Sequence, residues 1–512
     1  MRRRTVRGRL GGPLALASAL VVLVSACTVG PNYVRPSMIS PDAYKELDGW
    51  KIAQPRDGLA RGAWWEIFGD PQLNALEARV SISNQNLMVA EAQFRQARAL
   101  VREARAAYFP TVSLGLGYTR FRNSSTLASR SSSGSSTGTS SVTSGGGGSS
   151  ARATSDFQVG LDFSWELDVW GRIRRTVESN RANAQASAGD LESARLSFQA
   201  ELAQDYFQLR TVDAQKQLLD ETVAAFEKFL QLTRDRFASG VASQADVVQA
   251  QTQLKTTQAQ AIDVGVQRAQ LEHAIALLMG EAPSTFALPA APLAAGPPAI
   301  PVGVPSELLE RRPDIAAAER RVAVANAQIG VAVAAYYPTV TLNASSGLES
   351  SSLAKWFTAA SRFWSVGPGI SGTVFDGGLR GAQTDAARAA YDATVATYRQ
   401  TVLTSFQGVE DNLAALRILE QENGVQDDAV KAARKSVDLT TSQYKAGTVS
   451  YLNVITVQTI ALTDEITAIQ IRGRRMAAAV LLVQALGGGW TAAELPSSAD
   501  VTKRDDPAPS AP

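Results

Sequence analysis

The sequence predicts an α+β membrane protein built from two internal repeats, each with a pair of strands and a very long helical hairpin. Short motifs recur in the same order in both halves of the chain. Apolar residues alternate at period two in four short segments, and they recur at spacings of three, four or seven in long segments after each strand pair. A leader with the features of a secretion signal precedes both repeats.

The composition excludes several classes of function. The 512 residues include 50 Lys+Arg, 48 Asp+Glu, one His and one Cys. The near-zero net charge argues against a nucleic-acid partner, and the His and Cys counts exclude disulfide frameworks and zinc sites of the Cys/His type. Histidine-based catalysis would depend on His273 alone, so we expect no enzyme, cofactor or metal site; carboxylate-only catalysis stays open at this level.

Residues 1–26 have the form of a signal peptide. Five arginines in the first nine residues precede an apolar run that is too short for a spanning helix. The run ends in Val24-Ser25-Ala26-Cys27, which resembles a lipobox, so we expect Cys27 to be acylated after cleavage. The alternative is an ordinary signal peptide with an incidental cysteine. Thr28 stands in place of Asp, which favours delivery to the outer membrane by resemblance to known lipoproteins.

The internal repeat sets the predicted boundaries. Residues 107–114 recur as 335–342, at an offset of 228, and residues 237–240 recur as 444–447, at an offset of 207. The offset falls because the first copy contains a Ser/Gly-rich stretch at 123–155, which we expect to be a flexible external loop. The predicted parts, in chain order, are the leader 1–26, an N-terminal segment 27–70, a first repeat 71–282, a linker 283–310, a second repeat 311–490 and a disordered tail 491–512.

Each repeat has the same predicted anatomy. A helical segment ends before a proline, a strand pair follows, and a long helix then turns at a glycine and returns. The predicted elements of the first repeat are a helix over 71–107, strands 108–121 and 156–169, and a hairpin with its turn at 238–243. Those of the second are a helix over 311–335, strands 337–348 and 363–376, and a hairpin with its turn at 445–450.

The strands have apolar faces of bilayer length. Aromatic residues stand near the strand ends, as in interfacial girdles: Tyr118, Phe157, Trp165 and Trp364. In lipid an open four-stranded sheet would leave its edges unpaired, so only a closed barrel is allowed. Barrels begin at about eight strands, so at least two chains are needed, and three chains would give twelve strands. A soluble sandwich with one wet face is the usual alternative for alternating strands.

Three motifs carry a resemblance to a known family. They are the run Cys-Thr-Val-Gly-Pro-Asn-Tyr at 27–33, the run Trp-Glu-Leu-Asp-Val-Trp-Gly at 165–171 and the run Phe-Asp-Gly-Gly at 375–378. With the two Tyr-Phe/Tyr-Pro turns, they resemble the outer-membrane efflux protein family, and more closely the lipoprotein branch that serves resistance-nodulation-division multidrug pumps. The resemblance covers about residues 27–490.

The resemblance implies a homotrimer: a twelve-stranded outer-membrane β-barrel continuous with a long periplasmic α-helical barrel. It implies a passive, gated export duct for drugs or other small amphipathic molecules, anchored in outer-membrane lipid. A periplasmic adaptor and an inner-membrane resistance-nodulation-division transporter would be its partners, and the transporter would supply the energy. We expect the polar strand residues Asp162, Glu166 and Asp168 to face the lumen.

The resemblance also assigns two sets of site residues. The adaptor-binding tips correspond to Ser239, Gly240 and Val241 in the first repeat and to Ala446, Gly447 and Thr448 in the second. The closed aperture corresponds to Tyr444, Leu452, Asn453 and Thr456, faced by Asp246.

Physical expectations follow for the aperture. Three copies of Leu452 would form an apolar ring that resists wetting. Tyr444 is expected to hydrogen-bond Asp246. Related channels often carry acids where this chain has Asn453 and Thr456, so we expect weaker cation selectivity here. Simple helix packing is the alternative for Leu452.

Two other functional classes remain open to test. A periplasmic coiled-coil adaptor or structural lipoprotein would explain the hairpins, but two hairpins and four bilayer-length strands argue against it. A lipoprotein hydrolase acting through carboxylates is supported only by scattered acids.

Overall fold

The computed structural model describes residues 28–38, 41, 43–46, 63–122, 153–293, 296–300 and 307–503. The predicted signal peptide, Cys27 and most of the Ser/Gly-rich stretch lie outside these residues. The chain divides into two compact units. One contains the described parts of 1–32, 102–179 and 326–388, and the other contains the rest.

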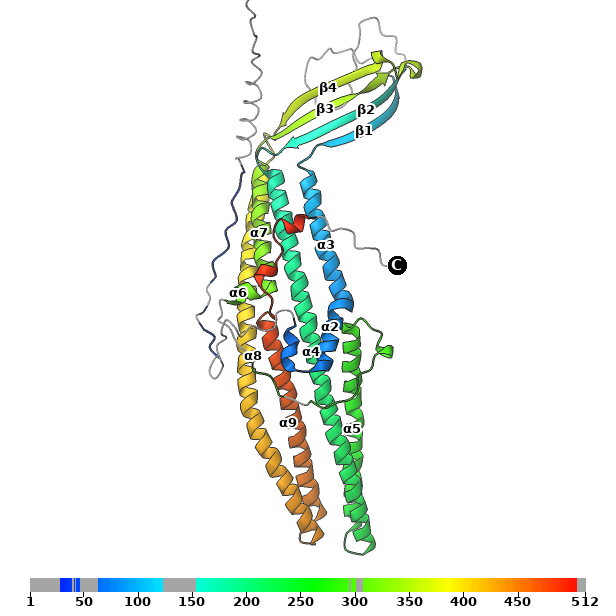
Figure 1. Ribbon diagram of the computed structural model, residues 1–512, viewed down its shortest axis with the longest axis vertical. Helices are drawn as coiled ribbons and strands as arrows, with labels where there is room; N and C mark the ends of the chain where they lie inside the picture. Colours follow the sequence, from blue (N-terminus) through cyan, green and yellow to red (C-terminus); the bar gives the residue numbers. More distant parts are fainter. Residues whose placement is uncertain are drawn as a thin grey trace, which may run out of the picture. The chain divides into compact units, whose positions relative to one another are not determined.

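The first unit contains an antiparallel sheet with the strand order β1-β2-β3-β4 (Figure 1). The strands are β1 (Thr111–Phe121), β2 (Thr154–Leu167), β3 (Thr339–Ser350) and β4 (Arg362–Ser371). Strand β2 of the first repeat pairs with β3 of the second, so the sheet joins the two repeats. Short 3-10 helices Leu353–Lys355 and Ala359–Ser361 connect β3 to β4.

The alternation of the strands gives the sheet two different faces. Leu114 pairs with Leu161 and Leu116 with Val159, so the apolar residues of neighbouring strands share one face. This face is open in the single chain: Leu116 is 75% exposed and Trp364 76% exposed. Glycine, serine, threonine, amide and acidic residues occupy most of the other face, which also carries Phe121 and Phe363.

The second unit is helical. The described helices are α2 (Pro71–Ser83), α3 (Gln85–Ala106), α4 (Arg172–Ala238), α5 (Gln244–Leu278), α6 (Leu308–Arg311), α7 (Pro313–Ala334), α8 (Leu379–Lys445) and α9 (Tyr451–Ala485), some of which begin or end in the first unit. Helices α4 and α8 each have 67 residues, and α5 and α9 each have 35. Helix α8 starts 207 residues after α4, and α9 starts 207 residues after α5, which matches the offset found in the sequence.

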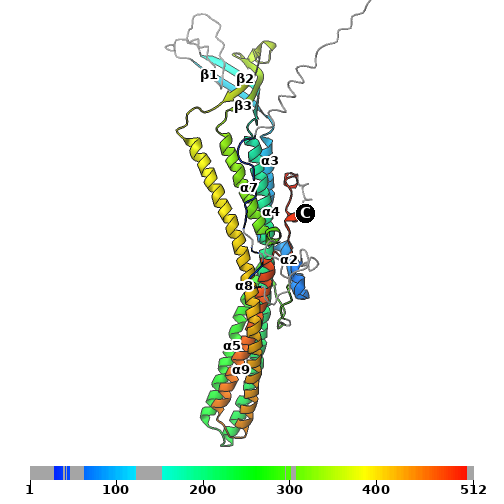
Figure 2. The same cartoon turned by 90° about the vertical axis from the view of Figure 1, so that its left-hand side faces the viewer.

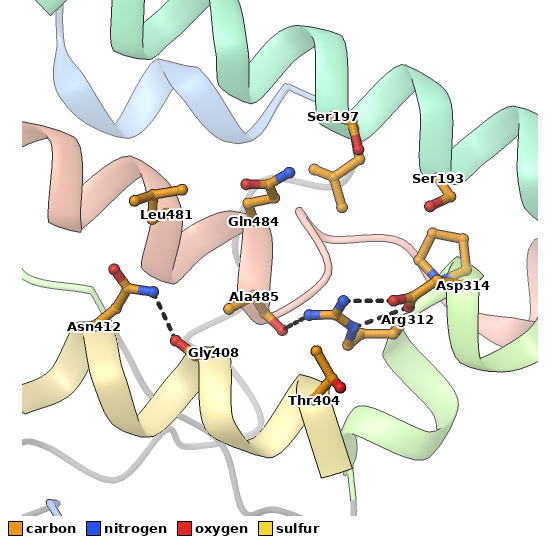
Figure 3. A pocket seen from close by; sticks show the side chains of 12 residues that line it. Ser193, Ser197, Arg312, Asp314, Thr404, Gly408, Asn412, Leu481, Gln484 and Ala485 are labelled. Carbon is orange, nitrogen blue, oxygen red and sulfur yellow. Dashed lines mark hydrogen bonds and ion pairs between the residues drawn. The ribbon is translucent and has the colours of Figure 1, made fainter. Parts of the chain in front are cut away.

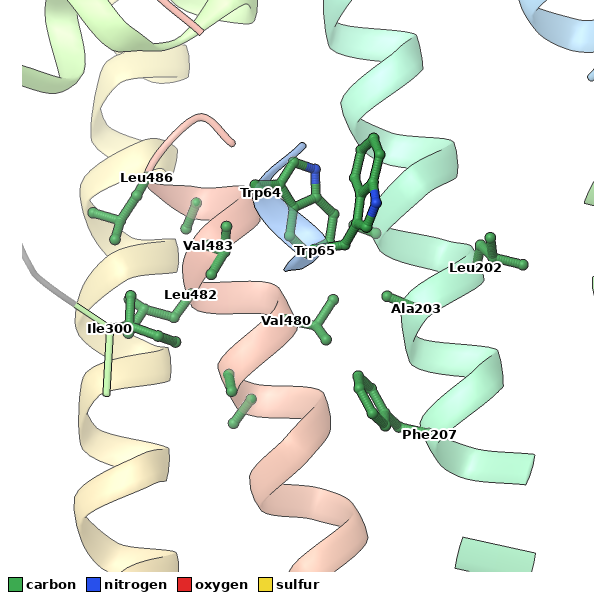
Figure 4. Packing of buried hydrophobic residues seen from close by; sticks show 14 of the residues in the cluster. Trp64, Trp65, Leu202, Ala203, Phe207, Ile300, Val480, Leu482, Val483 and Leu486 are labelled. Carbon is green, nitrogen blue, oxygen red and sulfur yellow. The ribbon is translucent and has the colours of Figure 1, made fainter. Parts of the chain in front are cut away.

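The two hairpins, α4 with α5 and α8 with α9, lie side by side (Figure 1, Figure 2). Burial rather than intrinsic propensity holds helices of about 100 Å together, because a helix this long needs neighbours to cover its apolar side. In the main core, the 3-10 helix Trp64–Phe68 inserts its two tryptophans among α4 and α9 residues such as Phe207 and Val480 (Figure 4). Trp64 is 1% exposed, and its Nε1 donates to Gln199 Oε1 at 3.2 Å.

One predicted helix is two helices in the structure. The segment expected as one helix over 71–107 breaks at Asn84, whose backbone is extended. The Asn84 side chain explains the break, because its Oδ1 accepts from the amides of Asn86 and Leu87 and so caps α3. Its Nδ2 donates to Leu278 O at 2.9 Å, which ties the break to the end of α5.

Two predicted ends were also wrong. Strand β4 stops at Ser371 rather than 376, since the Asp376 carboxylate accepts from Gly378 N and Arg380 N and begins α8 instead. The C-terminal tail was expected to be disordered from 491, but the described part to 503 is packed. It forms 3-10 helices Ala492–Glu494 and Asp500–Thr502, and Val501 is fully buried against α3 and α4 residues. The free energy gained by burying an apolar side chain offsets the loss of conformational entropy when this short segment is ordered.

Candidate functional site

The two hairpin turns have the same backbone geometry. Gly240 has φ +75° and Gly447 has φ +78°, the left-handed region that glycine enters without strain. Val241 N donates to Arg236 O at 2.8 Å, and Thr448 N donates to Gln443 O at 3.0 Å. These bonds close the ends of α4 and α8 in a Schellman-type cap.

All six predicted tip residues are exposed, in agreement with a surface that a partner can reach: Ser239, Gly240, Val241, Ala446, Gly447 and Thr448. A Cβ placed on either glycine would meet nothing within 4 Å. The glycines are therefore required by the backbone angle and not by crowding from other described residues.

The returning helices start differently. Ser243 and Asp246 form a capping box at the start of α5, with Ser243 N and Oγ both 2.9 Å from Asp246 Oδ2. At the start of α9 the corresponding residues are Ser450 and Asn453, and Ser450 makes no side-chain cap bond. The second turn thus lacks the capping box that stabilises the start of the returning helix after the first turn.

An aromatic cluster joins the two hairpins just inside the turns. Phe229 of α4 stacks on Tyr444 and on Tyr451, with ring centroids 5.9 Å and 5.6 Å apart. Tyr444 is 4% exposed and Tyr451 is 2% exposed. Phe226, Leu230, Ala250, Leu254 and Val454 complete this cluster, which we term the tip cluster.

Arg236 adds a polar connection at the same place. Its guanidinium lies 4.8 Å from the centre of the Tyr444 ring, and its Nη1 donates to Lys445 O at 3.1 Å. Because Lys445 is the last residue of α8, the cation also lies at the negative end of that helix. No pattern along the chain predicted this contact, which joins residues of different repeats that are 209 apart.

The expected hydrogen bond from Tyr444 to Asp246 was wrong. The Tyr444 hydroxyl is buried and has no hydrogen-bond partner among the described residues. The Asp246 carboxylate is occupied instead by Ser243. Burial raises the pKa of Tyr451, and nearby Tyr444 and Asp246 add to the shift, so the acid lies near the cluster without bonding Tyr444.

The remaining predicted aperture residues share the exposed side of the first turns of α9. Leu452 is 57% exposed, Asn453 and Thr456 are also exposed, and Tyr451 and Val454 point into the tip cluster. Thr456 Oγ1 donates to Leu452 O at 2.9 Å, so its hydroxyl bonds its own helix. The exposed Leu452 side chain is accessible to other chains in an assembly, although single exposed leucines are also common on the surfaces of monomeric proteins.

Of the three carboxylates predicted to face the lumen from a strand, two lie on the strand and one does not. Asp162 and Glu166 lie on the polar face of β2, opposite Ser345 and Thr341. Asp168 was wrongly placed on the strand: it follows the end of β2 and accepts from Ile173 N and Arg174 N at the start of α4. An acidic residue at a helix start is a common cap.

A cavity of about 250 Å³ in the helical unit is a structural junction (Figure 3). Arg312 pairs with Asp314 at 2.6 Å, and its Nη1 donates to Ala485 O at the end of α9. Serine, threonine and amide side chains line the rest together with apolar residues such as Leu196 and Leu481. Among the described residues no cluster of His, Cys, Asp or Glu is arranged to hold a metal, and His273 is exposed on α5.

No helix in the described part of the chain is both long and apolar enough to cross a membrane. The match to known families decides the identity. The model of the outer membrane efflux protein family matches residues 78–281 and 304–488. The chain belongs to the outer membrane efflux protein family.

Individual members of this family are similar over nearly the whole chain. The toluene efflux pump outer membrane protein TtgF of Pseudomonas putida is 31% identical over 489 residues, covering 93% of this chain and 96% of TtgF. The pyoverdine export outer membrane protein OpmQ of Pseudomonas aeruginosa is 30% identical over 482 residues, covering 93% and 97%. The solved outer-membrane channel OprN is 30% identical with a TM-score of 0.81, covering 91% of this chain and all of OprN.

This outer membrane efflux protein is therefore an outer-membrane component of an efflux pump that extends into the periplasm. The α+β class predicted from the sequence is confirmed. The family is one of transport channels and not of enzymes.

Proposed function

We propose that three copies of this chain assemble into a passive, gated export duct across the outer membrane and periplasm. One observation carries the trimer: the four-stranded sheet exposes an apolar face and leaves β1 and β4 each with one unpaired edge. Such edges are costly in lipid and disappear only in a closed barrel. Three copies would supply twelve strands, with β4 of one copy beside β1 of the next.

The hairpin tips are the proposed docking surface for a periplasmic adaptor, which would connect the duct to an inner-membrane resistance-nodulation-division transporter. The exposed small residues around Gly240 and Gly447 support this, because no residue in the described part of the chain fills the space above them. A helical hairpin of a partner can approach such a surface closely. The energy for export would come from the transporter, so the duct itself needs no cofactor.

Small organic and amphipathic molecules are the proposed cargo. Relatives are named for toluene efflux, antibiotic efflux and pyoverdine export, which differ in size and polarity. A duct whose lining does little filtering would suit all three, with selection left to the transporter. The carboxylates on the polar face of the sheet would then line the outer part of the lumen.

The aperture is proposed to lie at the start of α9. Leu452 would form an apolar ring around the threefold axis, and Asn453 and Thr456 would line the entrance without charge. The tip cluster and Arg236 would hold α9 against the first hairpin and so keep the ring in place. Neutral Asn453 and Thr456 support weaker cation selectivity than an acidic ring would give.

Cys27 is the proposed lipid anchor. The described residues that follow it are fixed beside the junction of β2 and α4: Val29 N donates to Trp170 O at 3.1 Å. The buried Arg175 guanidinium donates to Gly30 O and Asn32 Oδ1 at 3.2 Å and 3.0 Å. This would place an acyl chain near the end of the sheet, where a bilayer headgroup region would lie.

Single-channel conductance in planar bilayers tests the proposal, with wild type, Leu452→Ser and Leu403→Ser compared. Leu403 is a matched control, since it is 54% exposed on α8 and lies many helical turns before the end of that helix at Lys445. We expect wild type and the control to stay mostly closed and Leu452→Ser to open in discrete large steps. Equal conduction by all three would keep the duct but remove the aperture assignment. If no inserted sample conducts and the delipidated chain stays folded without detergent, the adaptor alternative is favoured instead.

A further inference from the structure

The charged residues of the sheet are sorted by sign between its two faces. Four carboxylates occur in the strands, and the pairing register puts all of them on the polar face: Asp156, Asp162, Glu166 and Glu349. The strands also contain two arginines, Arg120 in β1 and Arg362 in β4. Both stand on the apolar face, since Arg120 follows Tyr118 by two positions and Arg362 precedes Trp364 by two.

The two arginines also stand at the same end of the sheet. Strand β1 begins at Thr111, close after α3, so Arg120 is at the end far from the helices. Strand β4 begins with Arg362 at that far end and runs back toward α8. Both side chains are exposed, and among the described residues neither forms an ion pair. The described connection from β3 to β4 carries one further charge, the exposed Lys355.

Aromatic rings lie next to these cations on the same face. Tyr118 and Phe157 have centroids 4.8 Å apart, Phe157 and Trp356 are 5.7 Å apart, and Phe357 is 73% exposed beyond them. Aromatic belts mark the level of lipid headgroups in membrane proteins. An arginine at that level, directed to the lipid side, meets the headgroups and not the hydrocarbon.

Barrel closure would bring the two arginines together across chains. This step rests on the proposed trimer, in which β4 of one copy pairs with β1 of the next. The far ends of these antiparallel strands then meet, so Arg362 of one copy lies near Arg120 of its neighbour. Each seam between copies would present two guanidinium groups beside an apolar wall.

We propose that each seam binds the phosphate group of an anionic outer-leaflet lipid, with Arg120 of one copy and Arg362 of the next as the phosphate ligands. The planar guanidinium matches phosphate oxygens in a bidentate manner, which explains arginine rather than lysine at both positions. The exposed apolar residues below, among them Leu116 and Val366, would contact the acyl chains. The opposite face cannot serve, because its four carboxylates repel phosphate.

Native mass spectrometry of the detergent-solubilised full-length trimer tests this inference. Wild type, the double variant Arg120→Gln/Arg362→Gln and the control Arg399→Gln are titrated with bis-phosphorylated lipid A, with its dephosphorylated form and with inorganic phosphate. Arg399 is exposed on α8, away from the sheet. Each surface arginine contributes about fivefold to binding of an anionic lipid, so the double variant should lose about 25-fold in affinity for lipid A.

Wild type and the Arg399 variant should bind lipid A within twofold of each other and bind the dephosphorylated form much more weakly. Inorganic phosphate should not compete at equal concentration, since it lacks acyl chains. The inference is overturned if the double variant binds lipid A like wild type, if both forms of the lipid bind equally, or if inorganic phosphate competes fully. Conductance of the same samples separates the two proposals, because a wild-type trimer that conducts without preferring lipid A overturns only this one.

Discussion

Replacing Tyr444 with phenylalanine distinguishes two ways in which this residue can hold the hairpins together. The structure places the ring in the tip cluster, 4% exposed, stacked on Phe229 and covered by Arg236. The hydroxyl is buried without a hydrogen-bond partner among the described residues. The variant therefore keeps the ring contacts and removes only an oxygen that has lost its hydration.

The size of the effect follows from that oxygen. A buried hydroxyl with no partner costs about 1–3 kcal/mol, so we expect Tyr444→Phe to stabilise the folded protein by about 1 kcal/mol. In a chain of this length that raises the melting temperature by about 1–2 °C. Removing a hydrogen bond to Asp246 would instead destabilise by about 1 kcal/mol.

Thermal unfolding in detergent and single-channel recording measure the two quantities. We expect a higher melting temperature and an open probability no greater than that of wild type. Phe229→Ala is the contrasting variant, since it removes two ring pairs of about 0.5–1.5 kcal/mol each and should lower stability. A fall in melting temperature for Tyr444→Phe, with strong coupling to Asp246→Asn in a double-mutant cycle, would refute the reasoning.

Four further substitutions are expected to change the free energy of unfolding, one downward and three upward, and the last of these effects depends on pH. Gly473→Ala should destabilise the protein by about 1–3 kcal/mol, because a Cβ there would lie 2.8 Å from Thr211 Cγ2. Gly424→Ala should stabilise it by about 0.5–1 kcal/mol, because a Cβ there would meet no described residue within 4 Å. Melting curves of the two variants test both expectations. Asn453→Asp should supply the missing cap carboxylate of α9, raising stability by about 0.5–1 kcal/mol and increasing cation selectivity; an unchanged reversal potential would count against the aperture assignment. Burial raises the pKa of Asp205 to about 6, so its ionisation opposes folding as pH rises from about 4 to above 6. Asp205→Asn should thus be more stable than wild type at pH 7, by about 1 kcal/mol after solvent screening, and this advantage should vanish below about pH 4 in pH-dependent melts.

Local patterns predicted much of this fold. The alternation of apolar and polar residues in 157–167 identified a strand and both of its faces, because a period of two leaves only one way to sort side chains. The repeated glycines identified both hairpin turns, since only glycine takes a positive φ there without strain. Exposure of the predicted tip residues and of Leu452 agrees with their expected place on the surface.

Contacts between distant segments were not predictable in this way. Asn84 breaks a helix because its side chain bonds two local amides and a carbonyl of α5, a choice that depends on where α5 lies. The segment around Val501 has a composition typical of disordered tails. It is ordered because the Val501 side chain packs against apolar residues of α3 and α4. Asp246 had two possible hydrogen-bond partners, and the structure shows it bonded to Ser243 at the start of its own helix and not to Tyr444.

The sequence by itself determined the repeat, the period of each segment, the turns and the sign of charge on each strand position, because these depend on spacing along the chain. Only the tertiary structure decided which residues of the two repeats meet: Arg236 with Tyr444 and Lys445, and β2 with β3. Such pairings join residues about 200 positions apart, and their free energy depends on burial and distance in space, which spacing along the chain does not contain.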